Sequence, residues 1–327
     1  MNNDPDESSE TFALSISGLS YTYPGSHEKI LDDVSLEIRA GEKIAVVGAN
    51  GAGKTTLFLH LNGIIRSMPG AIRLFGTDIC DTDQKTRISS IGIVFADPDD
   101  QLFMPTVYDD VAFGPSNMGL SAQEVRERVE EALEMTGISG LSGDVSHHLS
   151  TGQKKMVALA AVLSMKPRIL VLDEPTANID QNGKKEIIRI IDQLHDAGTT
   201  TIIATHDMDL LSKMADRVYV LNKTIVCEGS PEEIFADPVV LAENGLEAPD
   251  IYRFFRMLSC PLFDSLSPPL CLDDAADILM KTADKRDCSC CLHARKPSGG
   301  SDSETSGSIR PDDQRCGRSF RLHGAAL

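Results

Sequence analysis

The residues with the clearest chemical potential lie between Gly48 and Thr56, where the sequence matches the pattern G-x-x-x-x-G-K-[ST] in full. Glycines in such a loop let backbone N–H groups approach a phosphate, and the helix that follows turns its positive end to the same point. The lysine of the pattern reaches the β- and γ-phosphates, and the next hydroxyl is placed to ligate Mg²⁺. We therefore expect a nucleoside triphosphate to be held by Gly48, Ala49, Asn50, Gly51, Ala52, Gly53, Lys54, Thr55 and Thr56.

A second group of residues suited to phosphate chemistry lies at the end of a later apolar run. Ile169–Leu172 is apolar at every position, as in a central strand of a parallel sheet, and runs into Asp173 and Glu174. Because the first pattern is present, Thr55 and Asp173 are expected to ligate Mg²⁺, and Glu174 can hold the attacking water as a general base. Taken alone, the acidic pair is equally consistent with an ordinary strand end.

Two further positions complete the expected phosphate chemistry. Leu149–Gln153 precedes a predicted helix, and a Ser and a Gly at a helix N-terminus can bind phosphate. One chain cannot readily bring both phosphate-binding loops to one nucleotide, so we expect two subunits to sandwich ATP. His206 follows an apolar run, and its order and spacing favour a γ-phosphate donor over an ordinary strand-end histidine. The residues expected to face the opposite subunit's ATP are Ser150, Thr151, Gly152 and Gln153.

An α/β scaffold is needed to hold these residues. Residues from about 97 to 166 carry helical periodicity, best seen at 122–135, where the outer face is rich in Glu and Arg. Elements of strand and helix character flank this region on both sides. Their order predicts a P-loop α/β core interrupted by an all-helical insertion. The predicted elements outside the insertion are strands at 12–17, 34–38, 44–47, 169–172 and 200–204, and a helix at about 182–197.

Composition narrows the class of protein. The 327-residue chain has a formal net charge of −18 and a pI near 4.8, which argues against binding the phosphate backbone of nucleic acids. No apolar run approaches the ~18 residues of a membrane span, and the acidic start is unlike a signal peptide. We therefore expect a soluble, cytosolic chain that can dock on a membrane protein. Four widely spaced cysteines are expected to be reduced and structural: Cys80, Cys227, Cys260 and Cys271.

The chain divides into four predicted segments. They are an acidic arm at 1–11, a nucleotide-binding domain at 12–240, a partly helical extension at 241–280 and a disordered tail at 281–327. In the tail the apolar periodicity vanishes and low-complexity sequence appears. A soft-metal site in the tail is conceivable, but the C-x-C-C spacing lacks the paired C-x₂-C of zinc modules. Its ligands would be Cys288, Cys290, Cys291 and His293.

Taken together, the motifs resemble those of ATP-binding cassette (ABC) ATPases over residues 12–240. The resemblance implies a P-loop NTPase core with an antiparallel β subdomain and an inserted α-helical subdomain. It also implies ATP and Mg²⁺ as cofactors, hydrolysis by Glu174, His206 and Lys54, and stacking of Tyr23 on adenine, the alternative being a tyrosine buried at a strand end. Five motifs stand in the family's order: Walker A at Gly48–Thr56, the signature at Leu149–Gln153, Walker B at Ile169–Glu174, the D-loop at Ala177–Asp180 and the switch histidine His206.

Further phrases are similar to the ATPase subunits of energy-coupling-factor importers, especially the cobalt/nickel group. They are Phe95–Thr106, Asp110–Pro115, 166–176 and Pro249–Tyr252, the last within a C-terminal extension for which the resemblance implies a role in dimerisation. The resemblance implies a subunit that powers a membrane importer through ATP-driven dimer closure, with cobalt or nickel as cargo and vitamins as the alternative. The implied partners are a transmembrane coupling subunit, a substrate-binding membrane subunit and a second ATPase, identical or paired. The implied location is the cytoplasmic face of the membrane.

Three positions depart from the family pattern. Ala96 stands where the family has a Gln whose amide contacts Mg²⁺ and the attacking water. Thr151 replaces a Gly of the signature, and Asn178–Asp180 reads Asn-Ile-Asp instead of Gly-Leu-Asp. The residues expected to perform catalysis are intact, so hydrolysis is still expected, but its rate and its coupling to transport are open.

Two other functions stay open. A soluble cassette protein acting on ribosomes or DNA usually carries two cassettes or a long coiled-coil insertion; this chain has neither, and its acidity opposes that function. The second is a regulatory partner with weak hydrolysis, in which Ala96 marks the impaired half of a heterodimer. An ATPase assay of the chain alone distinguishes the second from a catalytic subunit.

Overall fold

The computed structural model describes residues 12–258 and 267–283. The predicted acidic arm at 1–11 and the Cys288–His293 motif lie outside the described residues. A tail was predicted from residue 281, but the last described helix, α11 (Leu272–Ala283), continues through that position; the rest of the tail is outside the described part. None of the described helices combines the length and apolar character that crossing a bilayer requires.

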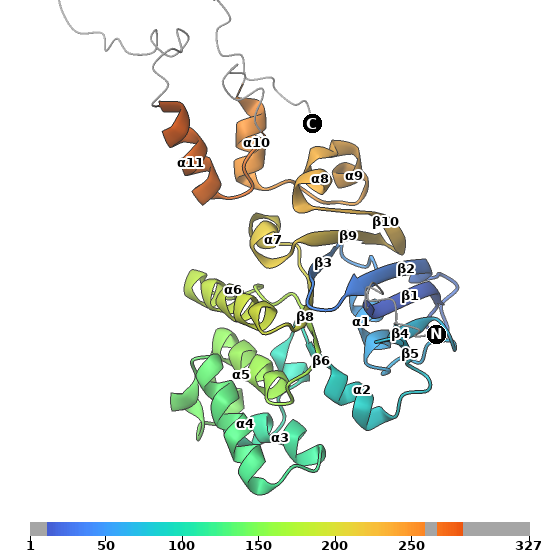
Figure 1. Ribbon diagram of the computed structural model, residues 1–327, viewed down its shortest axis with the longest axis vertical. Helices are drawn as coiled ribbons and strands as arrows, with labels where there is room; N and C mark the ends of the chain where they lie inside the picture. The colour runs from blue at the N-terminus through green and yellow to red at the C-terminus, as the bar shows by residue number, and fades with distance from the viewer. Residues whose placement is uncertain (1–11, 259–266, 284–327) are drawn as a thin grey trace, which may run out of the picture.

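The larger of two sheets has six strands and forms the centre of the molecule (Figure 1). Four of its strand pairs are parallel, and only the edge strand β10 runs antiparallel to its neighbour β9. Its inner strands are apolar runs buried on both faces, which is why they formed continuous hydrophobic stretches in the sequence. In spatial order the strands are β10 (Thr224–Gly229), β9 (Arg217–Asn222), β3 (Lys43–Val47), β8 (Thr200–Ala204), β7 (Ile169–Asp173) and β6 (Ile91–Val94).

The smaller sheet is antiparallel and packs over one face of the larger one. In β2 every second or third side chain is buried, as expected of a strand with one face in a core. The helix α1 (Lys54–Leu61) shares the core between the sheets through Leu57, Phe58 and Leu61. The spatial order is β2 (Leu31–Arg39), β1 (Phe12–Tyr21), β4 (Ile72–Leu74) and β5 (Thr77–Asp78), and the short helix α2 (Gln84–Ser90) leads back to β6.

Helices on the opposite face of the larger sheet build two further cores. One core joins the helical region to the sheet through Leu170, Leu172 and Ile203. Its helices are α3 (Val107–Asn117), α4 (Ala122–Met135), α5 (Thr151–Leu163) and α6 (Gln181–Asp196), with short 3₁₀ turns at Pro98–Asp100, Ser139–Leu141 and Ser146–His148. The architecture is the predicted α/β class with an antiparallel β subdomain and a helical insertion.

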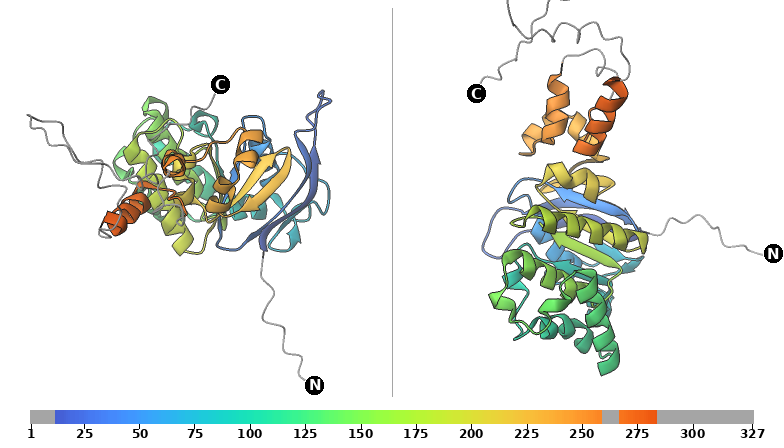
Figure 2. Two further views of the ribbon diagram at one scale, coloured as in Figure 1. Left: turned by 90° about the horizontal axis from the view of Figure 1, so that it is seen from above. Right: turned by 90° about the vertical axis from the view of Figure 1, so that its left-hand side faces the viewer.

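The third core connects the sheet to the C-terminal part of the chain. Val47 and Val218 of the sheet pack in one cluster with Leu246, Tyr252 and Leu270. Figures 1 and 2 place α8 to α11 of this part at the end of the molecule opposite to α3, α4 and α5, while α7 lies beside the sheet. Its helices are α7 (Met208–Met214), α8 (Pro231–Ala236), α9 (Pro238–Glu243), α10 (Asp250–Met257) and α11.

Candidate functional site

The loop from Gly48 to Gly53 joins β3 to α1, and its shape depends on two glycines. A Cβ on Gly48 would lie 2.1 Å from the carbonyl oxygen of Leu221, so no side chain fits there. Gly53 precedes α1 with a φ of 104°, in the left-handed region, and a Cβ on it would lie 2.8 Å from the carbonyl oxygen of Ile30. The loop therefore follows a path that only glycine permits, immediately before a helix N-terminus that can bind phosphate.

Lys54 lies across this loop. Its Nζ donates to the carbonyl oxygens of Gly48 at 2.7 Å and Ala49 at 3.2 Å. The side chain is buried, and this burial lowers the pKa of Lys54, while the nearby carboxylates of Glu174 and Asp173 oppose the shift. The lysine is thus positioned where phosphates would lie if the loop held them.

Thr55 and Asp173 meet at the carboxyl end of β7. The Thr55 hydroxyl donates to Oδ2 of Asp173 at 2.8 Å. Burial is the main cause that raises the pKa of Asp173, opposed by the Thr55 hydroxyl and by the ammonium groups of Lys54 and Lys155. A hydroxyl and a buried carboxylate offer the oxygen ligands that Mg²⁺ prefers, and a divalent cation would stabilise the ionised carboxylate. The donor set therefore fits the metal predicted for these two residues.

Glu174 and His206 form the adjoining pair. Nδ1 of His206 lies 2.7 Å from Oε2 of Glu174, while most of the imidazole is exposed. Glu174 has a φ of 50°, an uncommon left-handed conformation for a residue with a long side chain. Its N–H donates to the carbonyl oxygen of Ala204 at 2.9 Å, and its own carbonyl oxygen accepts from Nζ of Lys155 at 2.7 Å. Backbone contacts on both sides therefore hold the strained residue in place.

The signature residues lie at the start of α5. Ser150 caps the helix, and Ser150 and Gln153 form a reciprocal capping box with distances of 3.0 and 3.3 Å. A Cβ on Gly152 would lie 3.8 Å from the Ile179 side chain of the D-loop. The structure does not bring Ser150–Gln153 to the cavity beside the Gly48–Asn50 loop. Their role at the ATP of an opposite subunit stays a prediction.

Tyr23 lies beside the far end of the phosphate loop. Its hydroxyl is 3.1 Å from Oγ1 of Thr56, and its ring meets Tyr21 edge to face with 5.0 Å between centroids. The residue is 39% exposed, so it is not the buried strand-end tyrosine that was the alternative. An accessible ring near the loop can stack on a base.

Ala96 and Asn178, two of the three positions that depart from the family pattern, differ in how the structure accommodates them. The side-chain amide of Gln101, near Ala96 in the sequence, is engaged with the backbone, because it accepts from the N–H of Phe95 and donates to the carbonyl oxygen of Ala158. Asn178 has a φ of 58°, and asparagine tolerates this left-handed conformation better than most residues. Asn178 therefore keeps the D-loop geometry that a glycine would supply.

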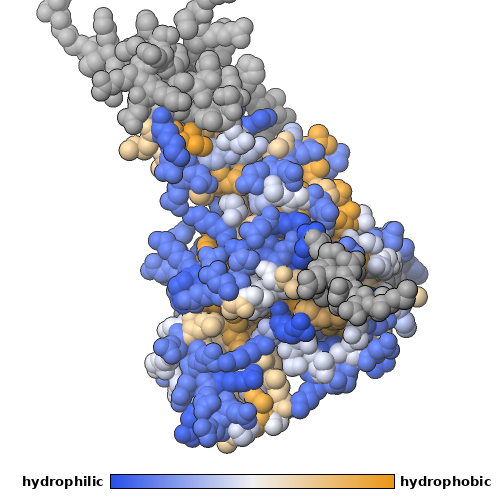
Figure 3. Space-filling view, in the orientation of Figure 1, coloured by the Kyte–Doolittle hydropathy of each residue, from blue (hydrophilic) through white to orange (hydrophobic). Residues whose placement is uncertain are grey.

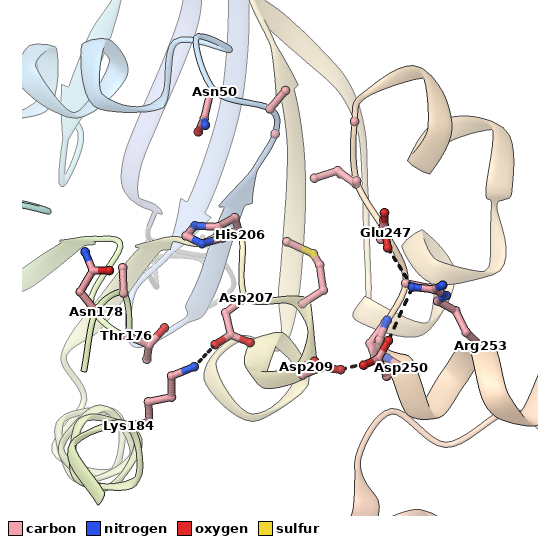
Figure 4. Close-up of a pocket in the computed structure, with 18 of the residues that line it drawn as sticks. Asn50, Thr176, Asn178, Lys184, His206, Asp207, Asp209, Glu247, Asp250 and Arg253 are labelled. Carbon is pink, nitrogen blue, oxygen red and sulfur yellow. Dashed lines mark hydrogen bonds and ion pairs between the residues drawn. The ribbon is translucent and has the colours of Figure 1, made fainter. Parts of the chain in front are cut away.

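A cavity of about 810 Å³ lies beside the loop and extends toward the C-terminal helices (Figure 4). A Cβ on Gly245 would lie 3.4 Å from Cβ of Ala49, so the segment before α10 borders the phosphate loop directly. The N–H of Asp250 donates to Asp209 of α7 at 3.0 Å. The lining joins Gly48–Asn50, the D-loop residues Ala177–Ile179, the switch segment His206–Asp209 and residues 245–250.

The sequence did not predict that residues 245–250 line the cavity or that Lys155 contacts the backbone of Glu174. Nothing local in the sequence places 245–250 beside a loop that is far away in the chain. For Lys155 a signal exists, because it shares the helical face of α5 with the buried residues Ala158, Leu159 and Val162. A lysine among apolar residues at helical spacing indicates a buried cation that needs a partner.

Comparison with known proteins places this site in a family. The matching family model is that of ABC transporters, over residues 31–177, and an AAA-domain model matches residues 144–212. An ABC transporter ATP-binding protein of Methanosarcina mazei is 45% identical over 251 residues, covering 76% of this chain and 77% of that protein. The energy-coupling factor transporter ATP-binding protein EcfA of Methanothermobacter thermautotrophicus is 46% identical over 250 residues, or 75% and 80% of the two chains.

Solved structures of ATP-binding cassettes are also similar to this chain. The structure of cbiO1 from Clostridium perfringens, described as part of the ABC transporter complex cbiONQ, is 42% identical with a TM-score of 0.62 and covers 72% of this chain and 94% of that one. The dimeric cassette MJ0796 bound to ADP and Pi, at 24% identity and a TM-score of 0.62, covers 67% and 98% and shows the same fold. At these identities and coverages, the chain belongs to the ABC transporter ATP-binding family and is an ATPase coupled to transport.

Proposed function

We propose that this chain powers a membrane importer for cobalt or nickel ions by closing and reopening as a dimer on two ATP molecules. The observation that carries the proposal is the convergence at one sheet edge of the Lys54 loop, the Thr55–Asp173 contact and the Glu174–His206 pair. The metal cargo is supported by the similarity of Phe95–Thr106 to the cobalt/nickel group. The 42% identity to cbiO1, a component of the cbiONQ complex, is in keeping with it.

In this proposal each residue of the sheet edge has a defined role. Lys54 and His206 contact the γ-phosphate, and Glu174 accepts a proton from the attacking water. Thr55 and Asp173 would hold Mg²⁺, which neutralises phosphate charge when bound. Little covalent chemistry is asked of the protein, so positioning and charge stabilisation supply most of the catalysis.

The second subunit completes each site. Ser150 and Gly152 stand at the N-terminus of α5, which is free of the chain's own phosphate loop and suited to the phosphates of the partner's ATP. The extension at 241–280 would contribute to the dimer through exposed apolar side chains on α10 and α11. These are Phe254, Met257, Leu272 and Met280.

The transmembrane partner would contact the segment Asp97–Thr106 and the neighbouring face of α3. Phe103 and Phe113 are both exposed there and meet edge to face with 4.9 Å between ring centroids. On the face shown in Figure 3 most of the surface is hydrophilic and apolar side chains gather in small patches. An exposed aromatic pair on such a surface is suited to anchoring a partner at the cytoplasmic face of the membrane.

Reconstitution with the co-purifying membrane subunits in vesicles tests the cargo. ATP-dependent uptake of Co²⁺ or Ni²⁺, absent with Glu174→Gln, is the expected result. Uptake of a vitamin without metal uptake would overturn the metal cargo and leave the importer function intact.

A second candidate function is a catalytically weak half of a heterodimer. Ala96 favours it, because no amide occupies that position and the amide of Gln101 is bound to backbone groups. Steady-state hydrolysis by the purified chain alone decides between the two. Turnover that appears only after a second ATPase subunit is added identifies the weak half.

A further inference from the structure

Lys155 is a buried cation on the helix that begins with the signature motif. It is 5% exposed and lies one turn beyond Ser150, the N-cap of α5. Its aliphatic stem borders a small apolar pocket whose lining includes Val94, Leu172 and Ile187. Burying a lysine in such surroundings is costly unless its ammonium group has a partner.

The partner is the backbone of the candidate base. Nζ of Lys155 donates to the carbonyl oxygen of Glu174 at 2.7 Å, and the N–H of Ala177 donates to the same oxygen at 3.3 Å. This one oxygen therefore joins the signature helix, the candidate base and the start of the D-loop. The contact uses only the backbone of Glu174, whose carboxylate instead contacts His206 at 2.7 Å.

Three nearby carboxylates favour the charged form of Lys155. Burial lowers the pKa of Lys155, whereas the carboxylates of Glu174, Asp173 and Asp97 oppose that shift. Lys154, the adjacent lysine, differs in its contacts. Its Nζ binds the largely exposed carboxylate of Asp99 at 2.7 Å, whereas Nζ of Lys155 binds the backbone at the end of β7.

We propose that Lys155 is a positioning residue that links the two ATP sites of the dimer, by tying the signature helix to the backbone of the same chain's Glu174. The inference rests on the proposed function, in which α5 faces the ATP of the opposite subunit and Glu174 serves the ATP of its own. When α5 engages the partner's ATP, a shift of the helix is carried through Nζ of Lys155 to the strained Glu174. Occupation of one site thereby sets the alignment of the base in the other.

Substitution of Lys155 by Met tests the link, because Met keeps the apolar stem and removes the donor. We expect kcat to fall about tenfold, as for a misplaced catalytic group, while the Kd for ATP stays within about twofold and the Hill coefficient for ATP falls toward 1. Lys155→Arg, which keeps a donor, should recover most of kcat. Lys154→Met is the matched control and should leave kcat and the Hill coefficient as in the wild type.

Mixed dimers show whether the effect acts on the base of the same chain. In a dimer of Lys155→Met with Glu174→Gln, the only intact base lies beside the substituted lysine, so turnover should be about tenfold below that of wild type paired with Glu174→Gln. Wild-type kcat and Hill coefficient in Lys155→Met would overturn the proposal. So would an equal loss in the Met and Arg variants accompanied by weaker ATP binding, since that indicates a structural role. Failure of the proposed function differs from failure of the Lys155 proposal, because the wild type itself would then show no hydrolysis as a dimer.

Discussion

The Nδ1 atom of His206 and the Oε2 atom of Glu174 are 2.7 Å apart, so the candidate phosphate donor and the candidate base contact each other. His206 also directs its backbone N–H toward the same Oε2 at 3.4 Å. For both side chains to serve a bound ATP, the contact must open or be shared with the attacking water. We therefore expect nucleotide binding to change this contact.

Glu174→Gln should abolish turnover and preserve ATP binding, because the amide keeps the shape of the carboxylate but cannot accept the proton from water. The variant should accumulate as an ATP-bound dimer. Steady-state hydrolysis and light scattering with ATP measure the two effects. Hydrolysis near the wild-type rate would show that another group is the base.

Ala96→Gln should speed ATP hydrolysis by the isolated chain. The substitution restores an amide near the Mg²⁺ and water positions. The two nearby polar residues that could replace it are engaged with the backbone, since Gln101 is bound to Phe95 and Ala158, and Asp97 accepts from the N–H of Asp99. A titration of kcat against Mg²⁺ checks the effect, and an unchanged rate with unchanged Mg²⁺ dependence would mean that the missing amide is compensated.

Asp173→Asn should stabilise the nucleotide-free protein while weakening Mg²⁺-dependent ATP binding. Burial raises the pKa of Asp173 in the folded state, so the folded chain binds its proton more tightly than the unfolded chain does. Stability is therefore lost as pH rises from the ordinary aspartate range through the raised pKa, and the loss is then constant. At pH values above the ordinary aspartate range, removing the buried charge should therefore raise the melting temperature of the nucleotide-free protein.

Thermal melts of Asp173→Asn and wild type between pH 4 and pH 8 measure this effect. The difference in melting temperature should be largest at the alkaline end and shrink as the pH approaches the ordinary aspartate range. The amide oxygen of Asn can still accept from Thr55, so loss of that hydrogen bond does not obscure the result. A lower melting temperature for the variant at pH 8 would contradict the prediction.

Deleting residues 284–327, beyond α11, should leave folding, ATP binding and hydrolysis nearly intact. Their composition, rich in Ser, Gly, Asp and Arg, offers little apolar surface to offset the entropy of ordering. Melts of the full and truncated chains with Co²⁺, Ni²⁺ or Zn²⁺ measure any contribution of Cys288–His293. A metal-dependent rise in melting temperature that disappears on truncation would identify a metal-binding latch instead.

Local patterns in the sequence were enough for the fold class and for several of the elements, whereas the bounds of β4, β5, β6, β9 and β10 were not predicted. The loop from Gly48, the apolar run of β7 and the acidic end at Asp173 each follow from residues that are neighbours in the chain, so their geometry could be predicted. The Gly245–Ala49 and Asp250–Asp209 contacts could not, because they join residues distant in sequence whose types carry no pairing signal.

Lys155 illustrates a different limit of prediction from sequence. The helical spacing of Lys155 with the buried apolar residues of α5 indicates which of the two lysines is buried, but the partner of its ammonium group depends on how α5 packs against the sheet. Lys154 points to Asp99 at the surface, while Lys155 reaches the strand end. The strained φ of Glu174 is likewise a tertiary result, since a glutamate after an apolar strand carries no local preference for a left-handed backbone.

The third hydrophobic core also affects how the chain folds during synthesis. Val47 of the central strand β3 belongs to the same hydrophobic cluster as Tyr252 and Leu270, which leave the ribosome long after it. Until then, one end of the parallel sheet exposes apolar surface, and a contact of such long sequence separation forms slowly. The nascent protein is therefore expected to need chaperone protection up to its last helices, and a ribosome stalled before Leu246 should yield an aggregation-prone product.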